Sequence, residues 1–279
     1  MLKQRVITAV VLLLLALPAL LASHPGPFAL FSTVLLAAAG WEWSRLNLPS
    51  KGAAYATGGL MALGCAGLWW AGWSADRGLA PLWWLALMLW VLGGAWALRG
   101  GVSGWSAVPA GLRWLLGVLL LWLAWLALNQ SMAVGVNHLL SVLCLVWVAD
   151  IAAYFGGRAF GRRKLAPAIS PGKSWEGVWS GGAGVLVLAG AWIAFDRSGL
   201  ADGPSLYTAL QARWGLGGLV VVCVFLTAMS VVGDLFESLV KRAAGVKDSS
   251  GLLPGHGGVL DRIDALLPVF PIAMALGSL

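Results

Sequence analysis

The chain has 279 residues, of which 60% are hydrophobic and only 10% are charged, whereas globular proteins carry about 25% charged residues. This composition excludes an ordinary soluble domain, and repeated apolar runs of about 20 residues predict an all-α, polytopic integral membrane protein. The net charge of +7 does not indicate a nucleic-acid partner, because cytoplasmic loops of membrane proteins are enriched in Lys and Arg. We therefore expect no nucleic acid to bind.

Nine apolar runs predict about nine transmembrane helices. The first run ends in a poor cleavage site and another run follows at once, which favours a retained helix over a cleaved signal peptide. The last run contains Pro268 and Pro271, so we expect it to be kinked or too short to span fully. Short connections are expected near 46–53 and 98–107. The nine runs cover residues 6–22, 27–44, 54–73, 79–97, 108–128, 137–156, 178–195, 214–236 and 264–279.

Basic residues are distributed unevenly between alternate loops. With the N-terminus in the cytoplasm, the outer loops contain only Arg77, Arg197 and Arg213 of the 18 basic residues. This asymmetry is typical of membrane proteins whose orientation follows the positive-inside rule. It predicts a cytoplasmic N-terminus and places two clusters of polar residues on the cytoplasmic side.

The first polar cluster begins in the sixth run. Asp150 and Tyr154 are four residues apart, hence on one face of a helix, and a carboxylate in an apolar run is expected to face a polar cavity. Further on, Lys173 and Ser174 follow Gly172, and a lysine with small neighbours suits a phosphate group. The triplet is not a P-loop, because Pro167 stands where that motif requires glycine. A basic loop that only anchors the chain is the alternative.

The second polar cluster lies between the last two runs. Asp234, Glu237, Ser238 and Lys241 have helical spacing and share a face. A glycine-rich loop and the opening of the next helix hold the other polar residues, which are Arg242, Lys247, Asp248, His256, Arg262 and the pair Asp261 and Asp264.

Carboxylates at two helix ends suit a divalent cation such as Mg²⁺, which proteins hold with one or two carboxylates plus substrate phosphates. Nearby Lys and Arg side chains can offset the negative charge of phosphoryl transfer. A set of ion pairs at helix ends around a glycine turn is the alternative interpretation. The sequence thus predicts N-terminal transmembrane helices over 1–135 and a C-terminal catalytic region over 136–279, with cytoplasmic loops 157–177 and 241–263.

At these residues the sequence resembles the phosphatidate cytidylyltransferase family, the CDP-diacylglycerol synthases. Residues 238–264 fit the family pattern S-x-φ-K-R-x4-K-D-x-small-x2-φ-P/G-x-H-G-G-φ-x-D-R-φ-D, in which φ is apolar. The first cluster and the Trp41-Glu42-Trp43 stretch are also similar to the family. One departure is Ile151, which stands where the family usually has a hydroxyl residue.

The resemblance implies transfer of CMP from CTP to phosphatidate, giving CDP-diacylglycerol and pyrophosphate, with Mg²⁺ held by Asp234 and Asp261. It also implies a bacterial inner (cytoplasmic) membrane location, with CTP, phosphatidate and the lipid bilayer as partners. A homodimer stays open. With the resemblance, we assign catalytic roles to Asp234, Lys247, Asp261 and Arg262. The residues expected to bind substrate are Asp150, Tyr154, Lys173, Ser174, Ser238, Lys241, Arg242, Asp248 and His256.

Two other functions compete with this one. Acidic residues within apolar runs are also found in transporters and channels, although transport sites lie near the bilayer midplane and these clusters lie at helix ends. A CTP-dependent polyprenol kinase would use a hydroxyl acceptor and release CDP. The long family pattern over residues 238–264 argues against the kinase.

Overall fold

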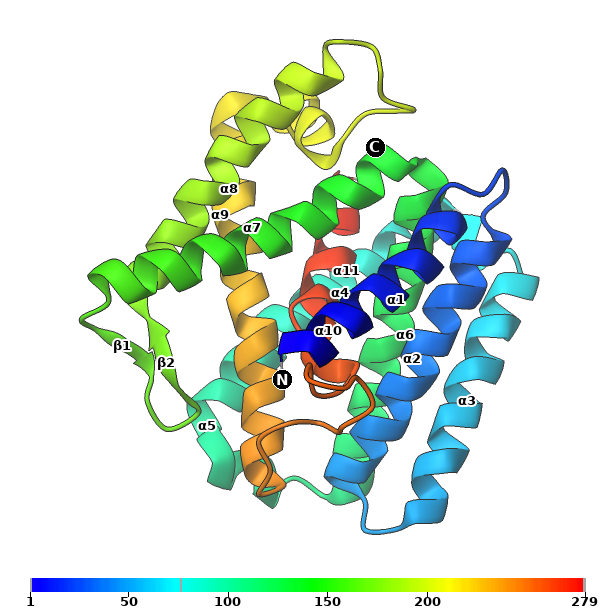
Figure 1. Ribbon diagram of the computed structural model, residues 1–279, viewed down its shortest axis with the longest axis vertical. Coiled ribbons are helices and arrows are strands. Elements are labelled where there is room, and N and C mark those ends of the chain that lie inside the picture. The colour runs from blue at the N-terminus through cyan, green and yellow to red at the C-terminus, as the bar shows by residue number, and fades with distance from the viewer. Residues whose placement is uncertain (1, 76, 278–279) are drawn as a thin grey trace.

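The computed structural model describes residues 2–75 and 77–277, and it places all nine predicted runs in helices as far as those residues extend. The final two residues of the run 264–279 lie outside the described residues. The long helices are α1 (Leu2–Leu20), α2 (Gly26–Asn47), α3 (Lys51–Trp70), α6 (Ala110–Val134), α7 (Val136–Phe160), α8 (Trp175–Asp196) and α9 (Leu206–Ala243). The shorter helical segments are α4 (Ala80–Met88), the π-turn η3 (Leu89–Gly93), α5 (Gly94–Ala107), α10 (Leu260–Ile263), α11 (Leu266–Gly277) and the 3₁₀ turns η1 (Trp73–Ala75) and η2 (Arg77–Leu79). Figure 1 shows their arrangement.

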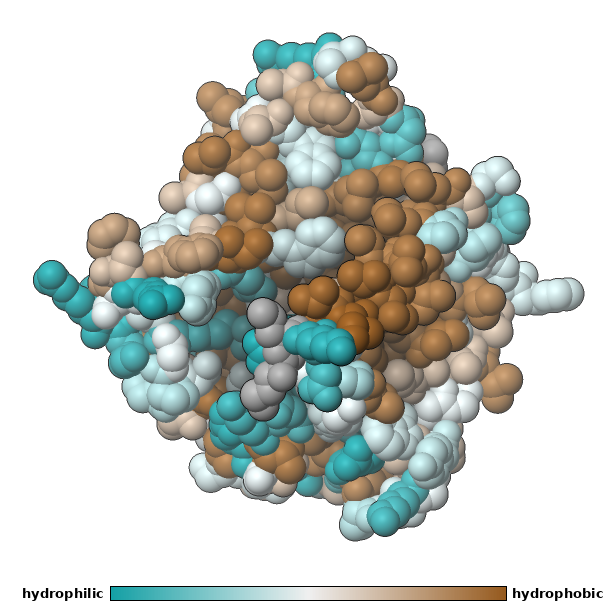
Figure 2. Space-filling model, viewed as in Figure 1, coloured by the Kyte–Doolittle hydropathy of each residue, from teal (hydrophilic) through white to brown (hydrophobic). Residues whose placement is uncertain are grey.

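Within the described residues, six helical segments are long and apolar enough to cross a membrane. Many of their apolar side chains point outward: Leu14 in α1 is 64% exposed and Val187 in α8 is 75% exposed. Large exposed apolar surfaces mark membrane contact, and the chain is an integral membrane protein. In Figure 2 apolar side chains cover α1, whereas hydrophilic residues gather around the β-hairpin described below. The six segments are Lys3–Leu20, Ala80–Ala107, Ala110–Val134, Val136–Phe160, Trp175–Asp196 and Leu206–Ala243.

The fold departs from a purely helical one in the first predicted loop. Strands β1 (Lys164–Ala166) and β2 (Ser170–Ser174) form an antiparallel hairpin with Lys164 opposite Ser174. Pro167 follows β1, where its fixed φ favours a tight turn, and the Ile169 N–H donates to the Ala166 carbonyl at 3.1 Å. The loop expected over 157–177 is therefore shorter, because α7 continues to Phe160 and α8 begins at Trp175.

A second departure is that the connection expected at 98–107 is helical. α5 continues through it to Ala107 and absorbs a local break at Gly101, whose φ of 61° is accessible to glycine. A similar break at Gly215, with φ 67°, divides α9. Glycine in these positions redirects a helix without ending it, so the prediction of a connection over 98–107 was wrong.

Close helix contacts position the two polar clusters. α8 packs against α7 through glycines: a Cβ on Gly177 or Gly181 would stand 2.9 Å from a backbone oxygen of α7. On α9, a Cβ on Gly233 would come within 2.5 Å of the Asp264 carbonyl oxygen. Small residues allow such approach in membrane helices. As a result, the end of α7, the start of α8, the middle of α9 and the start of α11 converge.

The α8–α9 connection, at the opposite end of α7 from the hairpin, depends on a carboxylate. Asp202 accepts hydrogen bonds from the Val136 N–H at 2.6 Å and the Asn137 N–H at 2.9 Å, and so caps the start of α7.

Removing such a cap destabilises a protein by about 1 kcal/mol. We expect Asp202→Ala to lower the midpoint of thermal unfolding in detergent by about 2–4 °C. Asp202→Asn keeps one acceptor oxygen and should lose less, and an unchanged midpoint in the alanine variant would show that the cap contributes nothing.

Candidate active site

The two polar clusters of the sequence meet at one cavity. Lys173, on β2, forms an ion pair of 2.6 Å with Asp234 on α9. The cavity beside this pair has a volume of about 510 Å³. Its polar lining comes from Asp150, Tyr154, Arg158, Lys173, Ser174 and Asp234.

The hairpin delivers Lys173 to the cavity because its base is fixed at the start of α8. Ser174 is the N-cap of α8 and accepts a hydrogen bond from the Gly177 N–H at 3.2 Å. Glu176 accepts from the Arg162 and Arg163 N–H groups at 3.1 and 3.2 Å, which ties the hairpin to the helix. The N-terminus of α8 therefore opens onto the cavity together with a lysine, and both features favour an anion such as a phosphate group.

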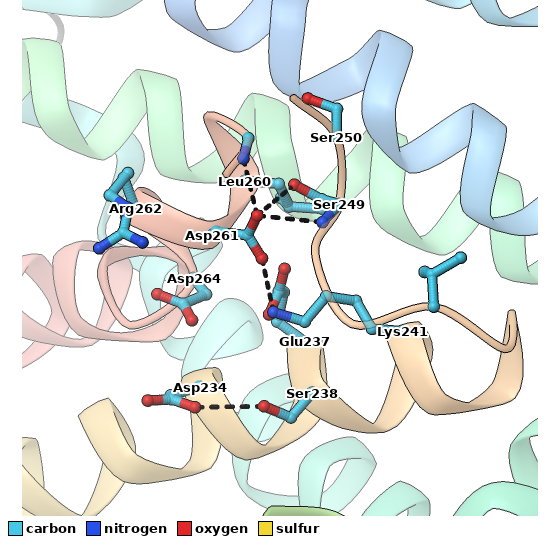
Figure 3. A network of polar contacts seen from close by, with 12 residues as sticks. Asp234, Glu237, Ser238, Lys241, Ser249, Ser250, Leu260, Asp261, Arg262 and Asp264 are labelled. Atoms are coloured by element: carbon cyan, nitrogen blue, oxygen red, sulfur yellow. Dashed lines mark hydrogen bonds and ion pairs between the residues drawn. The ribbon is translucent and has the colours of Figure 1, made fainter. Parts of the chain in front are cut away.

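The second cluster is built around one ammonium group. Lys241 forms ion pairs with Glu237 on its own helix and with Asp261 on α10, the latter at 2.5 Å. Figure 3 shows Lys241 between these two carboxylates and Asp234 hydrogen-bonded to Ser238 farther along α9. The Glu237 side chain is only 2% exposed. A carboxylate so far from water requires a counter-charge, which Lys241 supplies.

Asp261 also organises the loop that precedes it. Its Oδ2 accepts hydrogen bonds from the Gly258 N–H at 2.7 Å, the Ser249 N–H at 3.0 Å and the Ser249 hydroxyl at 2.9 Å. Burial opposes ionisation of Asp261, but the Lys241 ammonium and the Gly258 N–H outweigh it and lower its pKa to about 2. Asp261 is thus a permanent anion at neutral pH.

Asp264 lies between Asp234 and Asp261 in Figure 3. Burial, followed by repulsion from the Asp234 carboxylate, raises the pKa of Asp264, and the cations Lys173 and Lys241 oppose this only in part. The site therefore holds more carboxylates than its lysines neutralise, and it would gain from a further cation.

The remaining predicted site residues lie at the end of α9, on the loop that follows it and on α10. Arg262 donates to the His256 carbonyl at 2.6 Å, and Arg242 donates to the Ile169 carbonyl at 3.4 Å. Both arginine side chains therefore bind backbone carbonyl groups of neighbouring loops. His256 is half-buried, with its Nδ1 lacking a hydrogen-bond partner among the described residues. Lys247 and Asp248 are exposed on the loop, and neither side chain has a hydrogen bond or ion pair within the part of the chain that the structure describes.

Our interpretation of the sequence missed two residues as site members. Arg158 lines the cavity and donates to the Tyr154 hydroxyl at 3.5 Å; its position four residues after Tyr154 was a signal that we read only as part of a basic loop. Glu42, on α2, is fully buried beneath the second cluster. Its only sequence signal was a glutamate between two tryptophans. Ile151 is 57% exposed and is not among the residues that line the cavity.

Comparison with known proteins identifies the family of the chain. The model of the cytidylyltransferase family matches residues 3–279. The chain belongs to the cytidylyltransferase family. It is 40% identical to a phosphatidate cytidylyltransferase of Pseudomonas aeruginosa, over 99% of this chain and 97% of the relative. A Brucella suis protein of the same name is 32% identical over 100% of this chain and 94% of its own. One from Haemophilus influenzae is 52% identical over 49% of this chain and 44% of its own.

The carboxylates of this cytidylyltransferase-family chain fit a metal ion that is shared with a substrate. Among the described residues there is no group of three or more His, Cys, Asp and Glu side chains that could hold a metal ion. However, Glu237 Oε1 is buried without a hydrogen-bond partner, next to Lys241 and Asp261. Mg²⁺ commonly takes one or two protein carboxylates and completes its shell with phosphate oxygens and water. The donor set therefore suits an ion that arrives with a nucleotide.

The balance of charge around Lys241 gives a test of the site in this cytidylyltransferase-family protein. Lys241→Met leaves Glu237 and Asp261 facing each other without a cation, and breaking a buried pair typically costs about 3–5 kcal/mol. We expect a large fall in the thermal unfolding midpoint in detergent, partly restored by adding Glu237→Gln. Lys247→Met, on the exposed loop, is the matched control and should change stability by less than about 0.5 kcal/mol. Equal midpoints for the two lysine variants would contradict the assigned role of Lys241.

Proposed function

We propose that this chain transfers the CMP moiety of CTP to phosphatidate, giving CDP-diacylglycerol and pyrophosphate in phospholipid biosynthesis. The observation that carries the proposal is the match to the cytidylyltransferase family over residues 3–279. It is supported by near full-length relatives named phosphatidate cytidylyltransferase. The site is suited to this reaction, because its cavity is lined by two basic and two acidic side chains and a carboxylate cluster lies at its side.

In the proposed reaction, an oxygen of the phosphatidate phosphate attacks the α-phosphorus of CTP. The new P–O bond forms as the bond to the β-phosphate breaks, and pyrophosphate leaves. Two polyanions must approach each other, so charge compensation is the main requirement. Lys173, Arg158 and the N-terminus of α8 would receive phosphate groups in the cavity. Little proton transfer is needed, because the attacking phosphate is already ionised.

Mg²⁺ is part of the proposal. Asp234 and Asp261, the pair expected from the sequence, would hold the ion, with Asp264 lying between them in Figure 3. When bound, Mg²⁺ neutralises and aligns the triphosphate. Lys173 and Lys241 form ion pairs with these two aspartates, so the bound ion would take carboxylates that already have a cationic partner.

We also propose that the site faces the cytoplasm of a bacterial inner membrane. The distribution of basic residues supports this orientation, and CTP is a cytoplasmic substrate. Phosphatidate would keep its acyl chains in the bilayer and place its phosphate in the cavity. Residues Val178 and Val231, which also line the cavity, give it an apolar side that suits the start of a lipid chain.

The proposed reaction can be measured directly with purified protein in detergent micelles. The assay contains phosphatidate, Mg²⁺ and CTP labelled in the cytosine ring. We expect label to enter the lipid phase with release of an equal amount of pyrophosphate, and both signals to disappear with EDTA or without phosphatidate. Folded protein that binds CTP but labels no lipid would point to another acceptor. Absence of CTP binding would favour a transporter.

The same assay tests the carboxylates. Asp261→Asn keeps the shape of the side chain but removes its charge, and loss of one charge-stabilising group commonly lowers turnover by about 10²–10³-fold. We expect a loss of this size for Asp261→Asn and for Asp234→Asn. Asp202→Asn, at the far end of α7, is the isosteric control and should retain wild-type turnover. Near-normal activity of purified Asp261→Asn would remove this residue from the metal site.

A further inference from the structure

Glu42 is a fully buried carboxylate whose partners lie more than 200 residues later in the chain. It is on α2, and it reaches the loop and first turn that lead to Asp261. Its Oε1 accepts from the Ser250 hydroxyl at 2.5 Å and the Val259 N–H at 2.9 Å. Its Oε2 accepts from the Leu260 N–H at 2.6 Å and the Ser249 hydroxyl at 3.1 Å. Every one of these partners belongs to residues 249–260.

This contact is selective for a carboxylate. Three neutral donors converge on the two oxygens, and the single proton of the Ser249 hydroxyl is shared between Glu42 and Asp261. An amide in the same position would turn its NH₂ group toward two donors and leave them without an acceptor, which is unfavourable in a buried site. Two of the donors are the backbone N–H groups of Val259 and Leu260, which cannot turn away from the site as a side chain could. Glutamine, although nearly the same shape, should therefore not replace Glu42.

The loop is shaped to admit this side chain. A Cβ on Gly258 would stand 2.3 Å from Glu42 Oε1 and 2.1 Å from the Ser249 hydroxyl oxygen. Any other residue at position 258 would push the carboxylate away. The close approach of Glu42 from α2 thus explains the glycine at position 258, whose N–H also donates to Asp261.

Glu42 and Asp261 hold the same loop from opposite sides. The Ser249 hydroxyl lies within 3.1 Å of Glu42 Oε2 and 2.9 Å of Asp261 Oδ2. Gly258 and Val259 are consecutive, and their N–H groups point to Asp261 and Glu42, respectively. Movement of the loop away from Glu42 would therefore rotate Asp261 away from Lys241.

We propose that Glu42 is a positioning residue for CMP transfer: its buried carboxylate fixes residues 249–260 so that Asp261 is held against Lys241. This inference rests on the proposed function for its effect on turnover. The structural part of the inference, that Glu42 fixes the loop, does not depend on which reaction the site performs. Among the described residues, Glu42 is not one of those that line the cavity, and the ion pairs of Lys241 are with Glu237 and Asp261.

The test compares Glu42→Gln with Ser32→Ala. Ser32 is also buried on α2, and its hydroxyl donates to the Ala29 carbonyl and accepts from Asn129, away from the loop. Two experiments are made with each purified variant: steady-state kinetics, which give kcat and KM for CTP, and amide hydrogen exchange of peptides that cover 249–260. Displacing a catalytic group by about 1 Å lowers turnover about 100-fold.

For Glu42→Gln we expect kcat to fall about 100-fold with KM for CTP little changed, and exchange to accelerate in 249–260 but not in α6 or α11. Ser32→Ala should keep wild-type kcat and loop exchange. A kcat within twofold of wild type for Glu42→Gln would overturn the proposal. So would acceleration of exchange throughout the chain, because that result means that Glu42 supports the whole fold and not the loop.

A second variant keeps the proposal open to refutation if Glu42→Gln does not fold. Ser250→Ala removes one donor to Glu42 without touching Asp261, and it should lower kcat about tenfold with faster exchange of the loop. Unchanged kcat and exchange in Ser250→Ala would then overturn the proposal. Wild-type protein that transfers no CMP would refute the proposed function, whereas loop exchange that is insensitive to both variants would refute the role of Glu42.

Discussion

The ion pairs of Lys241 are the interaction on which the rest of the site depends. Glu237 and Asp261 come from different elements, and without an ammonium group between them their charges would repel each other where water is scarce. Transfer of charged groups out of water is expensive, and a buried pair seldom stabilises a protein more than apolar packing would. The main role of Lys241 is therefore to fix the positions of Glu237 and Asp261 relative to each other. It ties α9 to the start of α10, because its ammonium group pairs with Glu237 on one element and with Asp261 on the other.

The same balance of charge joins the hairpin to the helices. Lys173 reaches Asp234 only because β2 ends in the N-cap of α8 and because glycines let α8 approach α7 closely. Two clusters that are far apart in the sequence then share one group of charged residues, in which the acidic pair Asp234 and Asp264 lies between Lys173 and Lys241. In the proposed reaction, a polyanionic substrate and its cation would exchange with these internal pairs without leaving a buried charge unpaired.

Hydropathy was sufficient to locate the helices, because lipid imposes a length and a composition on each of them. It failed where backbone geometry decided the outcome. Gly101 lies in a segment that was expected to be a connection, but it bends a helix without ending it. The hairpin at 164–174 escaped prediction because two short strands have too few residues for a visible period. The helical spacing of Asp234, Glu237 and Lys241 did predict their common face.

Contacts between distant parts of the chain were beyond the reach of sequence reasoning. No local pattern connects Glu42 with Ser249 or Val259, and the apparent division into an N-terminal helical region and a C-terminal catalytic region conceals that connection. Arg5 and Thr8 add to it, since they donate to the Gly255 and Pro254 carbonyls at 2.9 and 3.0 Å. Helices α1 and α2 therefore help to hold the loop of residues 249–260 in place.

This connection has a consequence for biosynthesis. A ribosome adds residues one at a time, and α1 and α2 leave it long before residues 249–260 are made. Throughout that interval the Glu42 carboxylate has none of its final donors and must remain hydrated. The site becomes complete only when almost the whole chain has been synthesised and its last segment has returned to the first helices. A truncated chain, even one that retains Asp234, Lys241 and every long helix, would lack an ordered site.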